Sequence, residues 1–299
     1  MVGEVIATAD EARAFCGDAG DGLHLIFLFE SLGVPLTAPA VRALIERYET
    51  LFAAPLLPTW VFGNHDRRRR IARLDGSLEK AKLNAAWQLT ARGVPFLYNG
   101  EEIGIEQHHL PVRTSLDAVV DRFRSWPQPL FDLVCRLAGE SLNRDECRTP
   151  MQWSDEPNAG FCPRGVAPWL PVTPSYRERN VATQQLDPDS LWHCYRRFLA
   201  ARRQCAALNA GALELLPASD LPATVVGYVR RAAPGAEPRA VIVLLNCGDA
   251  ATDVNLPARA TPWVSTRARL PEVGADRVRL RPWEGLVLTL GETGVPDLR

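Results

Sequence analysis

The sequence lacks a long apolar run, a CxxC pair and an excess of charge of either sign. Without about 18 consecutive apolar residues, no membrane-spanning helix is expected. Lys and Arg number 34 and Asp and Glu 35, a net charge of −1, which gives no electrostatic basis for binding nucleic acid. Residues 1–10 lack a basic start followed by an apolar core, so they do not read as a signal peptide.

The seven cysteines are odd in number and are not spaced as metal ligands. This pattern indicates neither a disulfide framework nor a zinc site. We therefore expect reduced thiols in a cytoplasmic protein, with no metal and no other cofactor.

Apolar runs alternate with helix-length segments through the first two-thirds of the chain. Residues 24–29 form an almost continuous apolar run, typical of a strand buried on both faces. Residues 59–62 and 94–98 are further strand candidates, and helices are expected over residues 40–51, 78–92 and 190–204. This alternation predicts parallel βα units and an α/β fold, with the functional residues at the carboxyl ends of the strands.

Two further stretches follow a different pattern. Residues 107–185 are irregular and rich in Pro, Trp and Arg, as expected for a long functional loop. After Gly211, short β-type runs follow one another without helices, which predicts a small antiparallel β-sandwich. We therefore expect one domain over residues 1–210 and a second, all-β domain over residues 211–299.

Carboxylates lie at two predicted strand ends, Glu4 after a short apolar stub and Asp66 after a later strand. Two acids at the rim of one parallel sheet suit acid/base chemistry on a polar substrate. Acids after strands also cap the following helix, so spacing alone leaves both readings open.

Several longer motifs carry a family resemblance. Residues 61–66 (Val-Phe-Gly-Asn-His-Asp) resemble the motif at the seventh barrel strand of family 13 glycoside hydrolases, and residues 97–104 look like the stretch after the eighth. Residues 144–153 (Arg-Asp-Glu-Cys-Arg-Thr-Pro-Met-Gln-Trp) are similar to a long loop of the α-glucosidase and oligo-1,6-glucosidase branch. Residues 158–161, 169–172 and 180–181 fit the same branch.

The resemblance implies a fold as well as a family. Residues 2–4 then look like the fifth barrel strand and residues 23–29 like the sixth. A complete barrel takes roughly 250 residues or more. We therefore expect a partial TIM (β/α)8 barrel, strands 5–8, followed by the small antiparallel β-sandwich domain.

The family mechanism is retaining and uses a nucleophilic Asp, an acid/base Glu and a second Asp. By resemblance, Glu4 is the general acid/base, Asp66 the second Asp and His65 a donor to a glucose hydroxyl. Arg148 either binds substrate or shapes the loop. The Gly-Phe-Arg-x-Asp motif of the nucleophile and the family's earlier histidine motif are not in the sequence. The implied substrate is the terminal α-linked glucose of a short oligosaccharide, and the chain alone is expected to be inactive.

Other functions stay open. A transglucosidase or isomerase of the same family would use a sugar in place of water as acceptor, whereas a decayed remnant or a carbohydrate-binding module would have no catalytic role. If half of a barrel stands alone, its edge strands are open, and we expect self-association through them.

Several polar and aromatic residues have structural readings beside functional ones. The arginine run over residues 67–70 reads as a solvated helix start. Glu101 and Glu102 are expected to fix the loop after a strand, and His108 and His109 to lie on a loop surface or at the rim of a pocket. Three tryptophans either stack on sugars or anchor the long loop: Trp126, Trp153 and Trp169.

Overall fold

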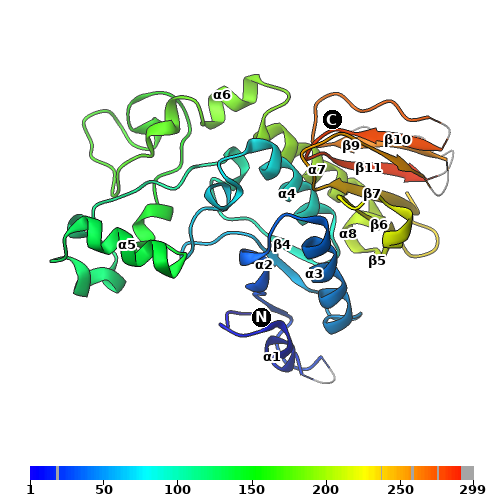
Figure 1. Cartoon of the computed structure of the whole chain (residues 1–299), viewed down its shortest axis with the longest axis horizontal. Helices are drawn as coiled ribbons and strands as arrows, with labels where there is room; N and C mark the ends of the chain where they lie inside the picture. Colours follow the sequence, from blue (N-terminus) through cyan, green and yellow to red (C-terminus); the bar gives the residue numbers. More distant parts are fainter. Residues whose placement is uncertain (18–19, 237, 257–258, 275, 291–299) are drawn as a thin grey trace. The chain divides into compact units, whose positions relative to one another are not determined.

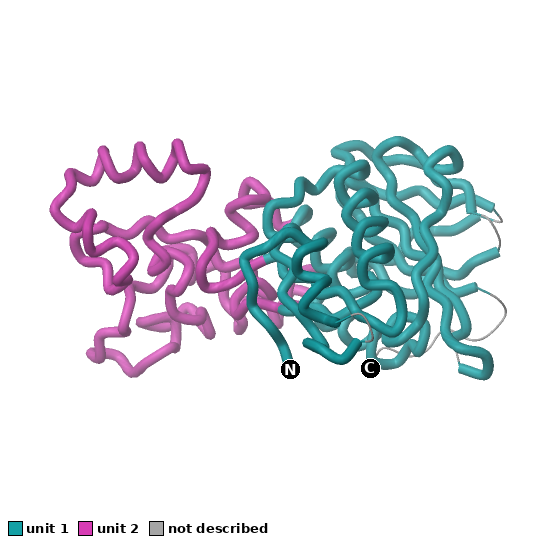
Figure 2. The backbone as a smooth tube through the Cα atoms, turned by 90° about the horizontal axis from the view of Figure 1, so that it is seen from below, with its two compact units in different colours: residues 1–62, 79–96, 193–299 teal, residues 63–78, 97–192 magenta. Residues whose placement is uncertain are grey.

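The computed structural model describes residues 1–17, 20–236, 238–256, 259–274 and 276–290. The chain divides into two compact units, coloured separately in Figure 2. The first unit holds residues 1–62, 79–96 and 193–299, and the second holds residues 63–78 and 97–192. Residues 291–299, the end of the predicted all-β domain, lie outside the described residues.

Four short parallel strands belong to the first unit. Strand β1 (Val2–Gly3) pairs in parallel with β2 (Leu25–Ile26), and β3 (Thr59–Val61) pairs in parallel with β4 (Val94–Phe96). Helices separate them in sequence, as Figure 1 shows for α2 (Glu30–Gly33), α3 (Ala38–Leu51) and α4 (Leu78–Thr90). The parallel βα units predicted from the sequence are therefore confirmed.

Side-chain hydroxyls connect β2 to β3. The Thr59 hydroxyl donates to the Ile26 carbonyl at 2.6 Å and accepts the Leu28 backbone N–H at 3.0 Å. The Ser31 hydroxyl donates to the Val61 carbonyl at 2.8 Å. Because these backbone groups are buried, each needs a partner, and the two hydroxyls supply it.

Replacing Thr59 by Val should destabilise the protein by about 1–3 kcal/mol. The substitution keeps the side-chain shape but leaves one buried carbonyl and one buried N–H without a partner. Chemical unfolding would measure the loss, and Thr59→Ser, which keeps the hydroxyl, is the matched control. Equal stability of the Val and Ser variants would contradict the bridging role.

The prediction that residues 24–29 are buried on both faces is wrong. Ile26 and Leu28 are buried, whereas Leu25, Phe27 and Phe29 are only half-buried. Phe27 meets Phe96 edge-to-face, with ring centroids 4.6 Å apart, and both rings keep some exposure. A continuous apolar run looks the same in sequence whether or not its second face is covered.

The expected self-association of the chain through open edge strands stays a prediction.

The helices of the first unit bury their apolar stripes. Helix α3 buries Val41, Ile45 and Tyr48 completely, and α4 buries Trp87 against Trp60, with ring centroids 5.4 Å apart. Gly93, which follows α4, has φ +115°, and a Cβ there would lie 2.2 Å from the Pro58 carbonyl oxygen. The helices expected over 40–51, 78–92 and 190–204 are confirmed with small shifts at their ends. The remaining helices of the unit are α1 (Ala9–Ala14), α7 (Leu191–Gln204), α8 (Ala206–Ala210) and the 3₁₀ turn η8 (Ala218–Asp220).

An antiparallel sheet follows α8, with strand order β5-β6-β7-β11-β9 (Figure 1). A two-stranded antiparallel sheet pairs β10 with β8. The sequence predicted five of these strands and missed β5 and β9, since β5 is half-exposed and β9 contains Pro262. Their bounds are β5 (Ala212–Leu215), β6 (Val225–Arg231), β7 (Ala240–Asn246), β8 (Thr252–Asn255), β9 (Ala260–Ser265), β10 (Arg277–Leu280) and β11 (Gly285–Leu290).

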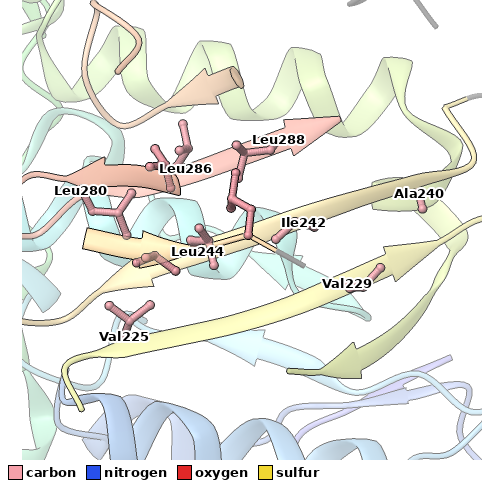
Figure 3. Packing of buried hydrophobic residues seen from close by; sticks show 11 residues of the cluster. Val225, Val229, Ala240, Ile242, Leu244, Leu280, Leu286 and Leu288 are labelled. Carbon is pink, nitrogen blue, oxygen red and sulfur yellow. The ribbon is translucent and has the colours of Figure 1, made fainter. Parts of the chain in front are cut away.

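Both faces of the sheet are buried at its central strands β6, β7 and β11. Alternate residues such as Ile242, Leu244 and Leu286 share one hydrophobic core with Val278 and Leu280 of the two-stranded sheet (Figure 3). We estimate about 1.5–3 kcal/mol for each large apolar side chain buried there.

The opposite face of the sheet packs on the end of α4. The Tyr228 hydroxyl lies 2.6 Å from that of Thr90, and the buried Arg230 donates to the carbonyls of Thr90 and Gly211. Burial lowers the pKa of Arg230 to about 10. The expected domain boundary near residue 211 falls where α8 ends, but the first compact unit groups the sheet with the parallel strands. The boundary therefore stays a prediction.

The second unit consists mainly of loops. It contains α5 (Gln128–Ala138), which buries Phe131 against Val112 and Val120, and α6 (Val181–Leu186). The sequence predicted an irregular stretch here and missed both helices. In the described ranges, no helix is long and apolar enough to cross a bilayer. The 3₁₀ turns of this unit are η1 (Arg70–Leu74), η2 (Glu101–Ile103), η3 (Val112–Thr114), η4 (Ala118–Phe123), η5 (Arg144–Cys147), η6 (Pro157–Gly160) and η7 (Pro174–Arg177).

Candidate active site

The second unit brings three of the four predicted site residues together: His65, Asp66 and Arg148. A turn over residues 64–66 fixes the backbone of Asp66, because the Asp66 N–H donates to the Asn64 side-chain oxygen at 3.1 Å. Glu4 belongs to the first unit, where it follows β1 and is exposed to solvent.

Two arginines converge on a single oxygen of Asp66. Arg144 Nη1 and Arg148 Nη2 each donate to Oδ1 at 2.9 Å. His65 Nε2 lies 3.4 Å from the same oxygen. Among the residues that the structure describes, the second oxygen, Oδ2, has no hydrogen-bond partner. Oδ1 of Asp66 is thus fixed in position, and Oδ2 is left to accept a hydrogen bond from a ligand hydroxyl.

Arg144 is itself fixed by Asp117. Its Nε and Nη2 donate to the two carboxylate oxygens of Asp117 at 2.8 and 2.7 Å. The Asp117 side chain is 1% exposed, and its hydrogen bonds with Arg144 lower its pKa to about 2. Arg144 lies in the motif over residues 144–153, whereas the sequence around Asp117 shows no periodic pattern that marks this residue.

Arg148 contacts the neighbouring turn and also lines a pocket. Its Nε donates to the His65 carbonyl at 2.8 Å, which ties the loop to the turn that holds Asp66. It also lines a pocket of about 440 Å³ together with His65, Tyr98, Phe161 and Trp169. This volume is within the roughly 300–1,000 Å³ typical of small-molecule sites. The pocket therefore offers charged donors and aromatic faces to one ligand.

Comparison with known proteins gives the family. The family model described as "Alpha amylase, catalytic domain" matches residues 1–211. The chain belongs to the alpha-amylase family. It is 31% identical over 268 residues to a probable alpha-glucosidase of Rhizobium meliloti (strain 1021), which covers 88% of this chain and 44% of that protein. It is 36% identical over 241 residues to an alpha-glucosidase of Pediococcus pentosaceus, which covers 71% of this chain and 42% of that protein.

The chain is also similar to solved structures. The trehalulose synthase MutB from Pseudomonas mesoacidophila MX-45 superposes with a TM-score of 0.80 at 26% identity, over 96% of this chain and 55% of that one. The chain thus spans about half the length of the relatives that it matches. The antiparallel sheet accompanies the catalytic-domain fold in this chain.

In this alpha-amylase family chain, Tyr98 is positioned by a buried arginine. Arg69 lies over the Tyr98 ring, 4.9 Å from its centroid, and donates to the Asn99 carbonyl at 2.6 Å. Arg69 and Arg70 are both buried, so the reading of residues 67–70 as a solvated helix start is wrong for its second half. A run of four arginines shows charge but not which side chains find buried acceptors.

The loop after β4 is closed by its own carboxylates. Glu101 Oε2 accepts the Tyr98 N–H at 3.2 Å, and Glu102 Oε2 accepts the Gly100 N–H at 2.7 Å. The expectation that these glutamates fix the loop is confirmed. The other oxygen of Glu101 is buried without a hydrogen-bond partner among the described residues, and burial raises the pKa of Glu101 to about 7.

Stability should fall as pH rises from about 4.5 to about 7 because of Glu101. A carboxyl with a raised pKa binds its proton more tightly in the folded than in the unfolded chain, so deprotonation favours unfolding across this window. Glu101→Gln should remove this slope. The check is the free energy of unfolding measured by denaturant at pH 5, 6, 7 and 8, with the exposed Glu106→Gln as control. Parallel curves for wild type and Glu101→Gln would contradict it.

A larger cavity, about 540 Å³, lies beside α5. Its polar groups are bonded to one another: His109 Nδ1 lies 3.1 Å from Glu146, whose second oxygen accepts from Gln107 and Ser141. No group of three or more metal-binding side chains occurs among the described residues. The pocket lined by His65 and Arg148 is therefore the better candidate for a ligand.

Proposed function

We propose that this chain provides part of a retaining glycoside hydrolase that acts on terminal α-linked glucose of short oligosaccharides. In this proposal, Glu4 is the general acid/base and Asp66 the carboxylate that holds ring hydroxyls in the transition state. His65 and Arg148 bind the same glucose. The chain contributes strands 5–8 of a (β/α)8 barrel and a β-sandwich.

The observation that carries the proposal is the arrangement around Asp66. Two guanidinium groups hold Oδ1, and Oδ2 has no partner in the described chain. A carboxylate that is already oriented can strengthen its hydrogen bond to a sugar hydroxyl as the ring flattens, without reorganising itself. Similarity to alpha-glucosidases supports glucose as the sugar.

A transglucosidase or isomerase is the second candidate. The similarity to a trehalulose synthase over 96% of this chain favours it. The two functions share the glucose-binding groups and differ in whether water or a sugar accepts the glucosyl unit. A carbohydrate-binding module would need the pocket but not the acid Glu4.

Glucose binding tests the proposal. Ligand-observed NMR with glucose should show binding by the wild-type chain in the millimolar range or tighter. Asp66→Ala should weaken binding at least roughly ten-fold, because a charged hydrogen bond contributes about 1.5–3 kcal/mol. Asp132→Ala, in the other cavity, is the control and should leave binding unchanged. Equal binding by both variants would show that glucose does not use Asp66.

A further inference from the structure

A cavity of about 650 Å³ lies along helix α7 (Figure 1), and all its lining residues belong to the first unit. Its volume is within the roughly 300–1,000 Å³ typical of small-molecule sites. It shares no lining residue with the pocket beside His65 and Arg148. Most of its lining residues are basic: His193, Arg196, Arg197, Arg202 and Arg203.

The cavity along α7 has basic side chains without acidic ones. No Asp or Glu among the described residues lines it, although the charges of the whole sequence nearly cancel, to a net −1. Helix α7 itself contains no acidic residue. Exposed helices usually carry both signs, because unlike charges on neighbouring turns attract each other. Positive charge is therefore concentrated here, and the cavity attracts anions.

One of the arginines also has a structural role. Arg202 Nη1 donates to the carbonyls of Leu89 and Ala91 at 2.8 and 3.0 Å, and its Nη2 donates to the Gly93 carbonyl at 2.5 Å. Arg202 thus satisfies carbonyls at the end of α4. All three acceptors are neutral, and in the described part of the chain Arg202 forms no ion pair. Its guanidinium group is therefore fixed in position while its charge is not cancelled.

Arg196 and Arg203 lie on one face of α7. A helix favours cations in its last turn, which accounts for Arg203, but this effect has faded at Arg196 in the middle of the helix. Both side chains are exposed. Seven residues separate them, so they are about 10 Å apart along the helix axis. Ala200 lies between them on the same face, and its short side chain leaves the space open.

We propose that this cavity binds a small molecule that carries two phosphate groups. A guanidinium group binds a phosphate through paired N–H donors, and Arg196 and Arg203 are far enough apart to take one phosphate each. Leu199 and Ala200 give the carbon skeleton between the phosphates an apolar surface. The site is independent of the proposed function, because none of its residues holds the glucose.

Isothermal titration calorimetry of the full 299-residue chain with fructose 1,6-bisphosphate tests the site. At low salt the bisphosphate should bind in the millimolar range or tighter. Orthophosphate reaches only one arginine, and pyrophosphate, with its two phosphates directly joined, is too short to reach both. Each should bind at least roughly ten-fold more weakly than the bisphosphate, because one charged contact is lost. Arg196→Ala and Arg203→Ala should each weaken bisphosphate binding by a similar factor.

Arg113→Ala is the matched control. Arg113 is exposed and lies outside the cavity, so its removal takes away the same charge without touching the site. It should leave bisphosphate binding unchanged. Arg203→Lys keeps the charge but loses the paired donors, and its affinity should lie between those of wild type and Arg203→Ala. Alanine favours helix, and thermal melts would show that each variant is folded.

Three outcomes would overturn the site. In the first, wild type does not bind the bisphosphate. In the second, it binds orthophosphate or pyrophosphate as tightly as the bisphosphate, so that the two arginines do not act together. In the third, Arg113→Ala weakens binding as much as Arg203→Ala does, so that only the general charge of the surface attracts the ligand. None of these results changes the outcome of the glucose-binding test.

Discussion

A nitrophenyl α-glucoside should remain unhydrolysed in the presence of the 299-residue chain alone. Retaining glycosidases form a covalent glycosyl intermediate on a carboxylate nucleophile, and the sequence holds no Gly-Phe-Arg-x-Asp motif to supply it. In the proposed function Glu4 protonates the leaving group and Asp66 binds hydroxyls, and neither role replaces this step. Enzymes typically accelerate their reactions about 10⁶-fold or more, and we expect this factor to be lost.

The measurement is the release of nitrophenolate, with Glu4→Gln as the control. The variant and the wild type should give the same background rate. Mixing the chain with a separately produced segment of a relative that carries the Gly-Phe-Arg-x-Asp motif should restore turnover, and that turnover should depend on Glu4. Turnover by the chain alone that Glu4→Gln abolishes would refute the expectation.

Arg144→Ala should destabilise the protein by about 3–5 kcal/mol. The substitution leaves the Asp117 carboxylate, which is 1% exposed, without the guanidinium that binds both of its oxygens. Removing one partner of a buried ion pair is costly because the other charge stays in a poorly solvated place. Since domains are stable by only about 5–15 kcal/mol, the effect should be large in urea unfolding.

Arg67→Ala is the matched control for Arg144→Ala. Arg67 pairs with Glu140 at 3.5 Å, and the two side chains are 45% and 31% exposed, so the loss of this pair should change the free energy of unfolding by about 1 kcal/mol or less. The double variant Arg144→Ala with Asp117→Ala should lose less than the sum of the single losses, because neither charge is then left alone. If Arg144→Ala lowers the free energy of unfolding as little as Arg67→Ala does, Asp117 does not hold Arg144 in place beside Asp66.

The regular elements of the fold could be predicted because their signals are local. The helix over residues 40–51 shows a period-3.6 apolar stripe, and the helix over residues 78–92 is followed by Gly93. Strands β6, β7, β10 and β11 are short β-type runs between turn residues. Strand β9 was missed because Pro262 interrupts its pattern, and α5 because it lies in a stretch dominated by Pro and charged residues. The half-exposed face of Phe27 and Phe29 could not be predicted, since burial of a face depends on what packs against it.

In the candidate site, too, the residues with local sequence signals could be predicted and the others could not. His65, Asp66 and Arg148 were predicted from motifs that are compact in sequence, and the structure brings them within hydrogen-bond distance. Asp117 could not be found in this way. Its importance comes from an ion pair with a residue 27 positions away, and the sequence around it gives no sign of that pairing.

The order of strands in the antiparallel sheet has a consequence for synthesis on the ribosome. Strand β11 lies between β7 and β9, although it is the last of the three to be translated. Until residue 290 has left the exit tunnel, β7 and β9 lack the strand that pairs between them, and their apolar residues stay exposed. The sheet can therefore close only after β11 has been translated, and until then the exposed apolar residues of β7 favour misassociation of the nascent chain.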